Sequence, residues 1–248
     1  MKVIASYSIK GGVGKTAAAV NLAAEAAARG RRVLLWDLDP QGAASFHLAE
    51  DAELKGGAEA LLAERKRLAT RVRGTHWPRL KLIPADFSHR QLDALLGDNK
   101  RPERRISRLL KPLRDSYDLV LLDCAPSISL TAESIFHAAD ALLVPVIPST
   151  LSLRTLQQLA GFIDDMPAEA PRLLAFFSML DRRRRMHQFT LEHPPRKLAE
   201  FLDTAIPNAA QVERMSGRAA PLRDFAPRCP AAQAYAALWR ELARRLDL

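Results

Sequence analysis

Apolar residues in this chain gather in short continuous runs, and between the runs they recur at intervals of three and four residues. The continuous runs are typical of strands buried on both faces of a parallel sheet. They predict strands at residues 2–8, 32–37, 80–84, 118–123, 141–147, 172–179 and 204–207. The spaced residues predict helices at residues 15–29, 57–70, 101–115, 130–138, 151–165, 188–202 and 230–246.

Because strands and helices alternate, the pattern predicts an α/β fold with a doubly wound, mostly parallel sheet flanked by helices. No repeat, low-complexity tract or linker interrupts the pattern, so we expect a single domain over residues 1–248. In sheets of this kind the ligand binds at the carboxyl ends of the strands.

Two of the predicted helices carry a clear apolar face. Within 101–115 the apolar positions are Ile106, Leu109, Leu110 and Leu113, and the opposite face holds Arg104, Arg105, Arg108 and Lys111. That basic face either contacts DNA or faces solvent. Within 230–246 the apolar positions are Tyr235, Leu238, Trp239, Leu242 and Leu246, which we expect to lie in the core.

Composition places the chain among intracellular proteins. Its 248 residues are 48% hydrophobic, enough to bury one sizeable core. Cys124 and Cys229 are the only cysteines, which excludes a disulfide framework or a four-thiolate metal site within the chain. The sequence has neither a signal-peptide pattern nor an apolar run long enough to span a bilayer. We therefore expect a cytoplasmic protein with no integral membrane contact.

The formal net charge of +9 is unevenly distributed. Lys and Arg far outnumber Asp and Glu in residues 65–114 and again in 172–248, whereas Arg154 is the only cation in residues 115–171. Such an excess suits binding to a polyanion such as DNA, which is independent of sequence and sensitive to salt. Arginines that only keep the helix surfaces soluble are the alternative.

A glycine-rich segment, residues 10–16, lies between the first predicted strand and the first predicted helix. It consists of Lys10, Gly11, Gly12, Val13, Gly14, Lys15 and Thr16. Glycines let the backbone turn its N–H groups onto an anion, and the helix that follows adds free amides and the positive end of its dipole. The lysine before the helix then binds the β- and γ-phosphates, and the threonine hydroxyl binds Mg²⁺. Ile9 replaces the first glycine of the usual pattern, so the loop is a variant.

Carboxylates follow two other predicted strands. Asp37 and Asp39 end the second, in a segment that continues Pro40, Gln41, Gly42. Beside a phosphate loop, an acid here holds a magnesium-bound water or orients the attacking water, and we assign that role to Asp39. Asp37 is expected to position the loop lysines or to pack at the strand end. Asp123 ends a buried strand and is expected in the second coordination shell of the metal, while Cys124 is expected to act as a small buried apolar residue.

These motifs resemble the ParA family of variant P-loop ATPases, in the partitioning and positioning branch that includes MinD. Residues 10–16 match the family's loop with its signature lysine, residues 37–42 match its first switch segment, and residues 123–126 resemble the second. Asn21, Leu22 and Ala23 fit the helix after the loop, and the closing segment around Ile206, Pro207, Pro221 and residues 232–235 also fits. The resemblance therefore runs nearly end to end. It is to the short form, which lacks an N-terminal helix-turn-helix.

The resemblance implies an ATP-dependent mechanism. ATP and Mg²⁺ close a sandwich homodimer in which Lys10 acts on the partner's nucleotide, while Lys15 and Thr16 act within their own subunit. The catalytic set is Lys10, Lys15, Asp39 and Asp123, with Thr16 and Asp39 at the metal. The dimer binds DNA without sequence specificity on the nucleoid, and a ParB-like or adaptor protein stimulates its slow hydrolysis. The result is the positioning or segregation of a cargo such as a chromosome, a plasmid or a carboxysome.

Nucleotide contacts are expected from residues 10–17 and from Pro207 and Asn208. Ala17 stands where many relatives have a second threonine, Ala125 replaces a proline, and Ser178 replaces an expected asparagine near the base. Gln211 occupies a position that is a DNA-binding arginine in many chromosomal relatives, so nearby arginines are expected to substitute. They are Arg214, Arg218, Arg223 and Arg228.

Several alternatives remain open at this stage. The run of arginines 182–185 with His187 either contacts nucleotide, DNA or a partner, or forms a solvated charge run. His187 itself is expected to be a surface or hydrogen-bonded histidine rather than a metal ligand. A MinD-like membrane-associated ATPase is the main alternative function and would need a detached terminal amphipathic helix. This chain lacks the cysteines that an iron–sulfur electron carrier needs, and a biosynthetic P-loop ligase or a protein kinase is a further alternative.

Overall fold

The computed structural model describes residues 1–49, 57–59, 68–97, 100–166 and 170–248. Its strands are β1 (Lys2–Ser6), β2 (Val33–Asp37), β3 (Arg73–Gly74), β4 (Leu80–Ile83), β5 (Leu119–Asp123), β6 (Ala141–Val146), β7 (Arg172–Phe177) and β8 (Glu200–Phe201). They form one sheet in the order β3-β4-β2-β5-β1-β6-β7-β8. Every pairing is parallel except that of β3 with β4. The predicted α/β fold with a mostly parallel sheet is confirmed.

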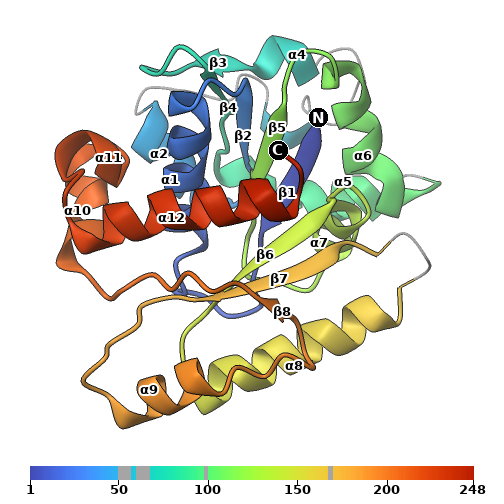
Figure 1. Ribbon diagram of the computed structural model, residues 1–248. Coiled ribbons are helices and arrows are strands. Elements are labelled where there is room, and N and C mark those ends of the chain that lie inside the picture. The colour runs from blue at the N-terminus through green and yellow to red at the C-terminus, as the bar shows by residue number, and fades with distance from the viewer. Residues whose placement is uncertain (50–56, 60–67, 98–99, 167–169) are drawn as a thin grey trace.

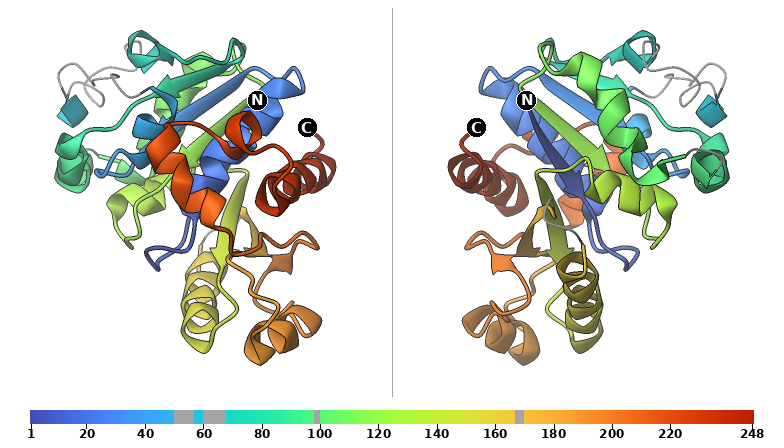
Figure 2. Two further views of the ribbon diagram at one scale, coloured as in Figure 1. Left: turned by 90° about the vertical axis from the view of Figure 1, so that its left-hand side faces the viewer. Right: turned by 90° about the vertical axis from the view of Figure 1, so that its right-hand side faces the viewer.

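Helices cover both faces of the sheet (Figure 1). One side carries α1 (Lys15–Ala28), α2 (Ala43–Leu48), α10 (Ala210–Arg218), α11 (Leu222–Phe225) and α12 (Pro230–Arg245). The other carries α5 (Leu92–Gly97), α6 (Arg105–Leu110), α7 (Leu130–Phe136) and α8 (Thr150–Asp164). In the right-hand view of Figure 2, α12 (red) and α6 (green) lie on opposite sides of the strands. The remaining elements are α4 (Leu68–Arg71), α9 (Arg185–Glu192) and the 3-10 helices η1 (Phe87–Gln91), η2 (Pro102–Arg104) and η3 (Lys111–Leu113).

Strand residues alternate between two hydrophobic cores. Val3 and Ala5 of β1 pack with α5 to α8, whereas Ile4 between them packs with α1 and α12. In the same way Leu34 and Trp36 of β2 face the first core, whereas Val33 and Leu35 face the second. This two-sided burial explains why the strands appear in the sequence as unbroken apolar runs.

The apolar faces predicted for two helices are buried. Ile106, Leu109, Leu110 and Leu113 are all at most 4% exposed. The C-terminal stripe is buried against α1 and the sheet, and its members are Tyr235, Leu238, Trp239, Leu242 and Leu246. Both stripes are therefore core, as expected.

The predicted boundaries fail where proline intervenes. The helix expected over 101–115 is divided into η2, α6 and η3, and Pro112 lacks the N–H that would continue α6 through η3. In place of the helix expected over 188–202, the chain forms α9, which ends before Pro194 and Pro195, and then β8. The prediction of a single helix there was wrong for the same reason.

The strand expected over 204–207 was also wrong. Only an isolated bridge joins Pro207 to Leu180, since the N–H of Thr204 bonds to a side chain of α12 and Pro207 has none. Of the helix expected over 57–70, residues 60–67 lie outside the described residues. The pattern did not predict α2, α10 or α11, which are short, with 6, 9 and 4 residues.

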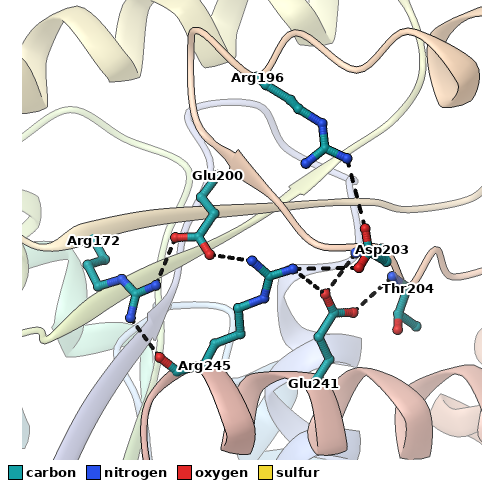
Figure 3. Close-up of polar contacts among 7 residues, drawn as sticks. All are labelled: Arg172, Arg196, Glu200, Asp203, Thr204, Glu241 and Arg245. Atoms are coloured by element: carbon teal, nitrogen blue, oxygen red, sulfur yellow. Dashed lines mark hydrogen bonds and ion pairs between the residues drawn. The ribbon is translucent and has the colours of Figure 1, made fainter.

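Ionic contacts join the end of α12 to β7, β8 and the turn that follows β8 (Figure 3). Glu200 accepts hydrogen bonds from Arg172 at 2.8 Å and from Arg245 at 2.6 Å. The buried carboxylate of Glu241 accepts from the backbone N–H of Asp203 at 2.8 Å and of Thr204 at 3.0 Å. These contacts hold the start of the segment that leads to Pro207.

Candidate functional site

The glycine-rich loop connects the end of β1 to the start of α1. Gly12 and Gly14 have φ angles of 70° and 96°, in the left-handed region that favours glycine, whereas Gly11 does not. A Cβ on Gly14 would lie 3.0 Å from the hydroxyl of Ser178, the residue after β7, so the chain beyond β7 approaches this loop closely. The Ser6 hydroxyl donates to the Lys15 carbonyl at 2.9 Å and so fixes the start of α1. The observed geometry is that of a loop that turns around an anion at a helix N-terminus.

Lys15 is 6% exposed at the base of the loop. Its ammonium donates to the Lys10 carbonyl at 3.5 Å. Burial lowers the pKa of Lys15, and the nearby carboxylates of Asp123 and Asp39 act in the opposite direction. The lysine and both predicted acids are therefore close enough to interact, which places three of the four predicted catalytic residues at one edge of the sheet.

Asp37 and Asp39 have different surroundings. Asp37 is fully buried, and its carboxylate accepts from the N–H of Asp39 at 3.1 Å and from both the N–H and the hydroxyl of Ser45. It packs at the strand end and fixes the turn into α2. Asp39 is partly exposed and accepts from the N–H of Gln41 at 2.9 Å. Of the two acids, Asp39 is the one that reaches solvent beside the loop.

Asp123 lies beside Asp37 in the register of β5 with β2. Burial raises the pKa of Asp123 well above its usual range and that of Asp37 to about 6, and the neighbouring carboxyl of Asp37 also raises that of Asp123. Within the described residues, neither oxygen of Asp123 has a hydrogen-bond partner of acceptable geometry, although the Thr16 hydroxyl is close enough to lower its pKa. Buried carboxylate oxygens without partners, next to a threonine hydroxyl, are the surroundings that Mg²⁺ and its waters fit.

The Lys10 side chain does not enter its own phosphate loop. Its ammonium donates to the Ser152 hydroxyl at 3.2 Å, in the first turn of α8. Ser152 is 3% exposed and also bonds to the hydroxyl of Ser149, the residue that caps α8. Lys10 therefore rests on a neighbouring helix of the same chain. Ser152 was not among the predicted site residues, because a serine at a helix start has no distinguishing sequence signal.

A small pocket opens beside Gly14. It includes both residues predicted to contact the base, Pro207 and Asn208, and also Ser178. The N–H of Asn208 donates to the Leu180 carbonyl at 3.0 Å, which holds this segment against the end of β7. The other lining residues are Met179, Ile206, Ala209, Val212, Glu213 and Tyr235.

The four arginines predicted to contact DNA differ in their surroundings. Arg214 and Arg218 on α10 and Arg228 beyond α11 are exposed. Arg223 is half-buried, donates to the Ala24 carbonyl at 3.1 Å, and pairs with a neighbouring glutamate on α1. Its guanidinium therefore attaches α11 to α1.

Two other features singled out in the sequence have structural explanations. Cys124 is 1% exposed, and burial raises the pKa of its thiol well above the usual range, as expected of a small buried residue. His187 is 4% exposed and accepts from the N–H of Asp181 at 3.0 Å, so it is a hydrogen-bonded histidine at the start of α9. Asp181 also pairs with Arg183 at 2.9 Å.

Comparisons with known proteins agree with this geometry. A family described as "AAA domain" matches residues 1–175. The chain is 32% identical over 254 residues to "Chromosome partitioning protein ParA" of Caulobacter vibrioides, covering 99% of this chain and 95% of that one. Among the described residues, no helix is both long and apolar enough to cross a bilayer.

Two solved structures have a similar fold. A cobyrinic acid a,c-diamide synthase from Mycobacterium smegmatis with bound ADP and magnesium superposes with a TM-score of 0.84 at 26% identity, covering 100% of this chain and 96% of that chain. A plasmid partition protein of Borrelia burgdorferi bound to AMPPNP has a TM-score of 0.80 at 20% identity, covering 98% of this chain and 99% of that chain.

Proposed function

This chain belongs to the ParA/MinD family of P-loop ATPases, and on that premise we propose that it is a dimerising switch that grips DNA when ATP is bound and positions a cargo. It is an ATPase of the partitioning or positioning type, and its cofactors are ATP and Mg²⁺. The DNA, the partner protein and the cargo belong to the proposal.

Lys15 and Thr16 hold the phosphates and the metal in the proposed mechanism, together with the amides of residues 11–17. Mg²⁺ held by Thr16 and Asp39 would neutralise the charge that develops on the phosphates. Asp39 contributes to the metal site and orients the attacking water. Asp123, whose buried oxygens have no hydrogen-bond partner among the described residues, would orient the second coordination shell of that metal. Pro207 and Asn208 contact the base from the pocket beside Gly14.

The position of Lys10 is the observation that carries the proposal. Because its ammonium lies on α8 and not in its own phosphate loop, the residue is available to a second subunit when it leaves Ser152. A cation delivered across an interface stabilises the charge on the transferring phosphoryl group, as an arginine finger does. Dimerisation then becomes a condition for hydrolysis.

A complementation experiment tests the shared lysine. Lys10→Ala leaves its own phosphate loop intact, and Lys15→Ala removes nucleotide binding but keeps Lys10. We expect each variant alone to be inactive and their mixture to recover part of the ATPase rate, because the second subunit supplies its lysine to the first. A mixture as inactive as its components would contradict action across the interface.

DNA binding is tested with duplexes of unrelated sequence. We expect the Asp39→Ala variant, locked with ATP, to bind all of them with similar affinity, and the affinity to fall steeply as salt increases. The predicted contacts are Arg214, Arg218, Arg223 and Arg228, with Arg223 contributing charge from its position against α1. Retention that is the same with ATP, ADP or no nucleotide would refute a nucleotide switch.

A MinD-like membrane ATPase is the second candidate. It would use a terminal amphipathic helix free of the fold, whereas the apolar stripe of α12 is packed against α1 and the sheet. A liposome pelleting assay with ATP separates the two functions. The chromosome partitioning protein of Caulobacter vibrioides is 32% identical to this chain and the synthase from Mycobacterium smegmatis 26%, so the proposal follows the partitioning relative.

A further inference from the structure

A pocket of about 120 Å³ lies between the two segments that resemble the family's switches, and we call it the inter-switch pocket. Leu38 and Pro40, which flank Asp39, line it from the first segment, and Ala125 lines it from the second. His89 of η1 also lines it. A histidine that no motif marks in the sequence thus shares a pocket with both neighbours of the proposed metal ligand.

The backbone around η1 fixes the His89 ring. The Asp86 carboxylate caps this helix by accepting the N–H of Ser88 at 2.8 Å, and the backbone N–H of Asp86 donates to Nδ1 of His89 at 3.2 Å. These reciprocal bonds form a capping box. His89 is only 3% exposed, so close packing and the cap together hold the imidazole in one orientation.

The same cap assigns the proton on the ring. A backbone N–H can only donate, so Nδ1 of His89 accepts and the proton of the neutral ring lies on Nε2. A proton on Nδ1 would face the Asp86 N–H, and the Asp86 carbonyl, 3.1 Å from Nδ1, already accepts the His89 N–H at 3.0 Å. Burial lowers the pKa of His89, which keeps the ring neutral at pH 7.

The Nε2–H of His89 is therefore a donor without an acceptor. Nε2 is buried, and none of the described residues accepts a hydrogen bond from it. Buried donors left unpaired are unfavourable and rare in folded proteins. On the wall of the same pocket, the carbonyls of Leu38 and Pro40 accept no backbone N–H from the described residues. A small displacement of the first switch segment can satisfy both groups.

Asp39 is held mainly by its own segment. Its N–H donates to the Asp37 carboxylate at 3.1 Å, and its own carboxylate accepts the Gln41 N–H at 2.9 Å. The Asp39 carboxylate is also close enough to His89 to raise the pKa of that ring, against the larger effect of burial. A donor from η1 would therefore add a fixed point outside the segment, beside the acid that has to meet the metal.

We propose that His89 is a positioning residue for Asp39, whose Nε2–H donates to the carbonyl of Leu38 or Pro40 when ATP and Mg²⁺ are bound. The bond forms across the inter-switch pocket and holds Asp39 at the metal. The ring itself stays neutral and touches neither nucleotide nor metal. This inference rests on the role proposed for Asp39 in the metal site.

Nuclear magnetic resonance of the ¹⁵N-labelled ring tests the assignment without any catalysis. In the nucleotide-free protein at pH 7, we expect the signals of His89 to show a protonated Nε2 and an unprotonated Nδ1. Their absence from the His89→Gln spectrum identifies them. With Mg²⁺ and a non-hydrolysable ATP analogue, the Nε2–H signal should move downfield as the new hydrogen bond forms. A proton on Nδ1, or an Nε2–H signal that does not move, would overturn the inference.

Two substitutions separate the donor from the cap. His89→Asn places an oxygen near the position of Nδ1 but no group at that of Nε2, whereas His89→Gln carries an N–H that reaches it. We expect kcat for ATP hydrolysis to fall about tenfold in His89→Asn with KM for ATP unchanged, the effect of losing a group that orients a metal ligand. His89→Gln should recover most of this rate. His76→Asn, exposed in the loop before β4, is the matched control and should keep it.

A purely structural role for His89 predicts a different result. Both variants would then unfold at lower urea concentration, while kcat of the folded protein would equal that of the unmodified protein, and this result would overturn the inference. An Asp39→Ala variant that hydrolyses ATP as fast as the unmodified protein would instead refute the role proposed for Asp39.

Discussion

Among the groups that join α12 to the nucleotide-binding edge of the sheet, we expect the Glu241 carboxylate to contribute most to the free energy of unfolding. It accepts the backbone N–H groups of Asp203 and Thr204 and the Arg245 guanidinium, the last at 3.1 Å (Figure 3). Glu241→Ala removes all three bonds at once. Hydrogen bonds to a charged group contribute about 1.5–3 kcal/mol each and are not additive, so we expect a loss of at least about 3 kcal/mol.

For a chain of this size such a loss lowers the melting temperature by about 6–12 °C. Nucleotide binding should weaken as well, because Asp203 and Thr204 begin the segment that ends at Pro207 and Asn208 in the base pocket. Urea unfolding measures the loss of unfolding free energy, and titration with a fluorescent ATP analogue measures the nucleotide affinity. The matched control is Arg240→Ala, an exposed neighbour on α12 whose side chain, among the described residues, bonds only to the Ala236 carbonyl of its own helix.

The pH dependence follows from the same contacts. Burial alone would raise the pKa of Glu241, but hydrogen bonds from Asp203, Thr204 and Arg245 outweigh it and leave the pKa below its usual value. The stabilisation is therefore present above the unfolded pKa near 4.5 and is lost as the pH falls through the lower folded value. A Glu241→Ala variant as stable as the Arg240→Ala control at pH 7 would refute the reasoning.

Three further outcomes are expected. Asn21→Ala should cost about 2 kcal/mol in urea unfolding, because the Asn21 side chain accepts the buried Leu222 N–H at 2.9 Å, and an unchanged midpoint would contradict this. Ala219 has a φ of 45°, in the left-handed region that favours glycine. Ala219→Gly should raise stability by about 0.5–1 kcal/mol by relieving this strain, as a thermal melt would show, and a lower melting temperature would count against it. Burial raises the pKa of Asp37 to about 6, so its ionisation destabilises the folded protein as the pH rises from its unfolded pKa near 3.8 through 6. The unfolding free energy of Asp37→Asn minus that of the unmodified protein should therefore rise by about 1.4 kcal/mol from pH 5 to pH 7.5. A difference that stays constant with pH would exclude this effect of Asp37 ionisation.

The sequence predicts the centre of the fold well because burial on both faces leaves a strong signal. β1, β2, β5 and β6 are each apolar nearly throughout, and each lies within two residues of its predicted bounds. The periphery is less predictable, since β8 is two residues long and is held by pairing with β7 and by contacts with α12. Local pattern cannot reveal a strand whose stability comes from distant partners.

The phosphate loop, Asp39 and Asp123 are visible in the sequence because fixed spacing and strand ends bring them to one edge. Ser45, which donates two hydrogen bonds to Asp37, is not visible in this way, and neither is Ser152, which holds Lys10. Both are serines in the first turn of a helix, a position where serine is common for local reasons. Their role depends on which distant side chain the fold brings to them.

The contact of Lys10 with Ser152 also affects when hydrolysis begins in the proposed mechanism. The single subunit holds its signature lysine on its own helix, and on the proposed mechanism that bond must break before a partner receives the cation. On the proposed mechanism, hydrolysis starts only after both release and encounter, so its onset slows as the protein is diluted. During that delay a subunit diffuses away from the place where it was loaded, and the length of the delay sets how far it travels.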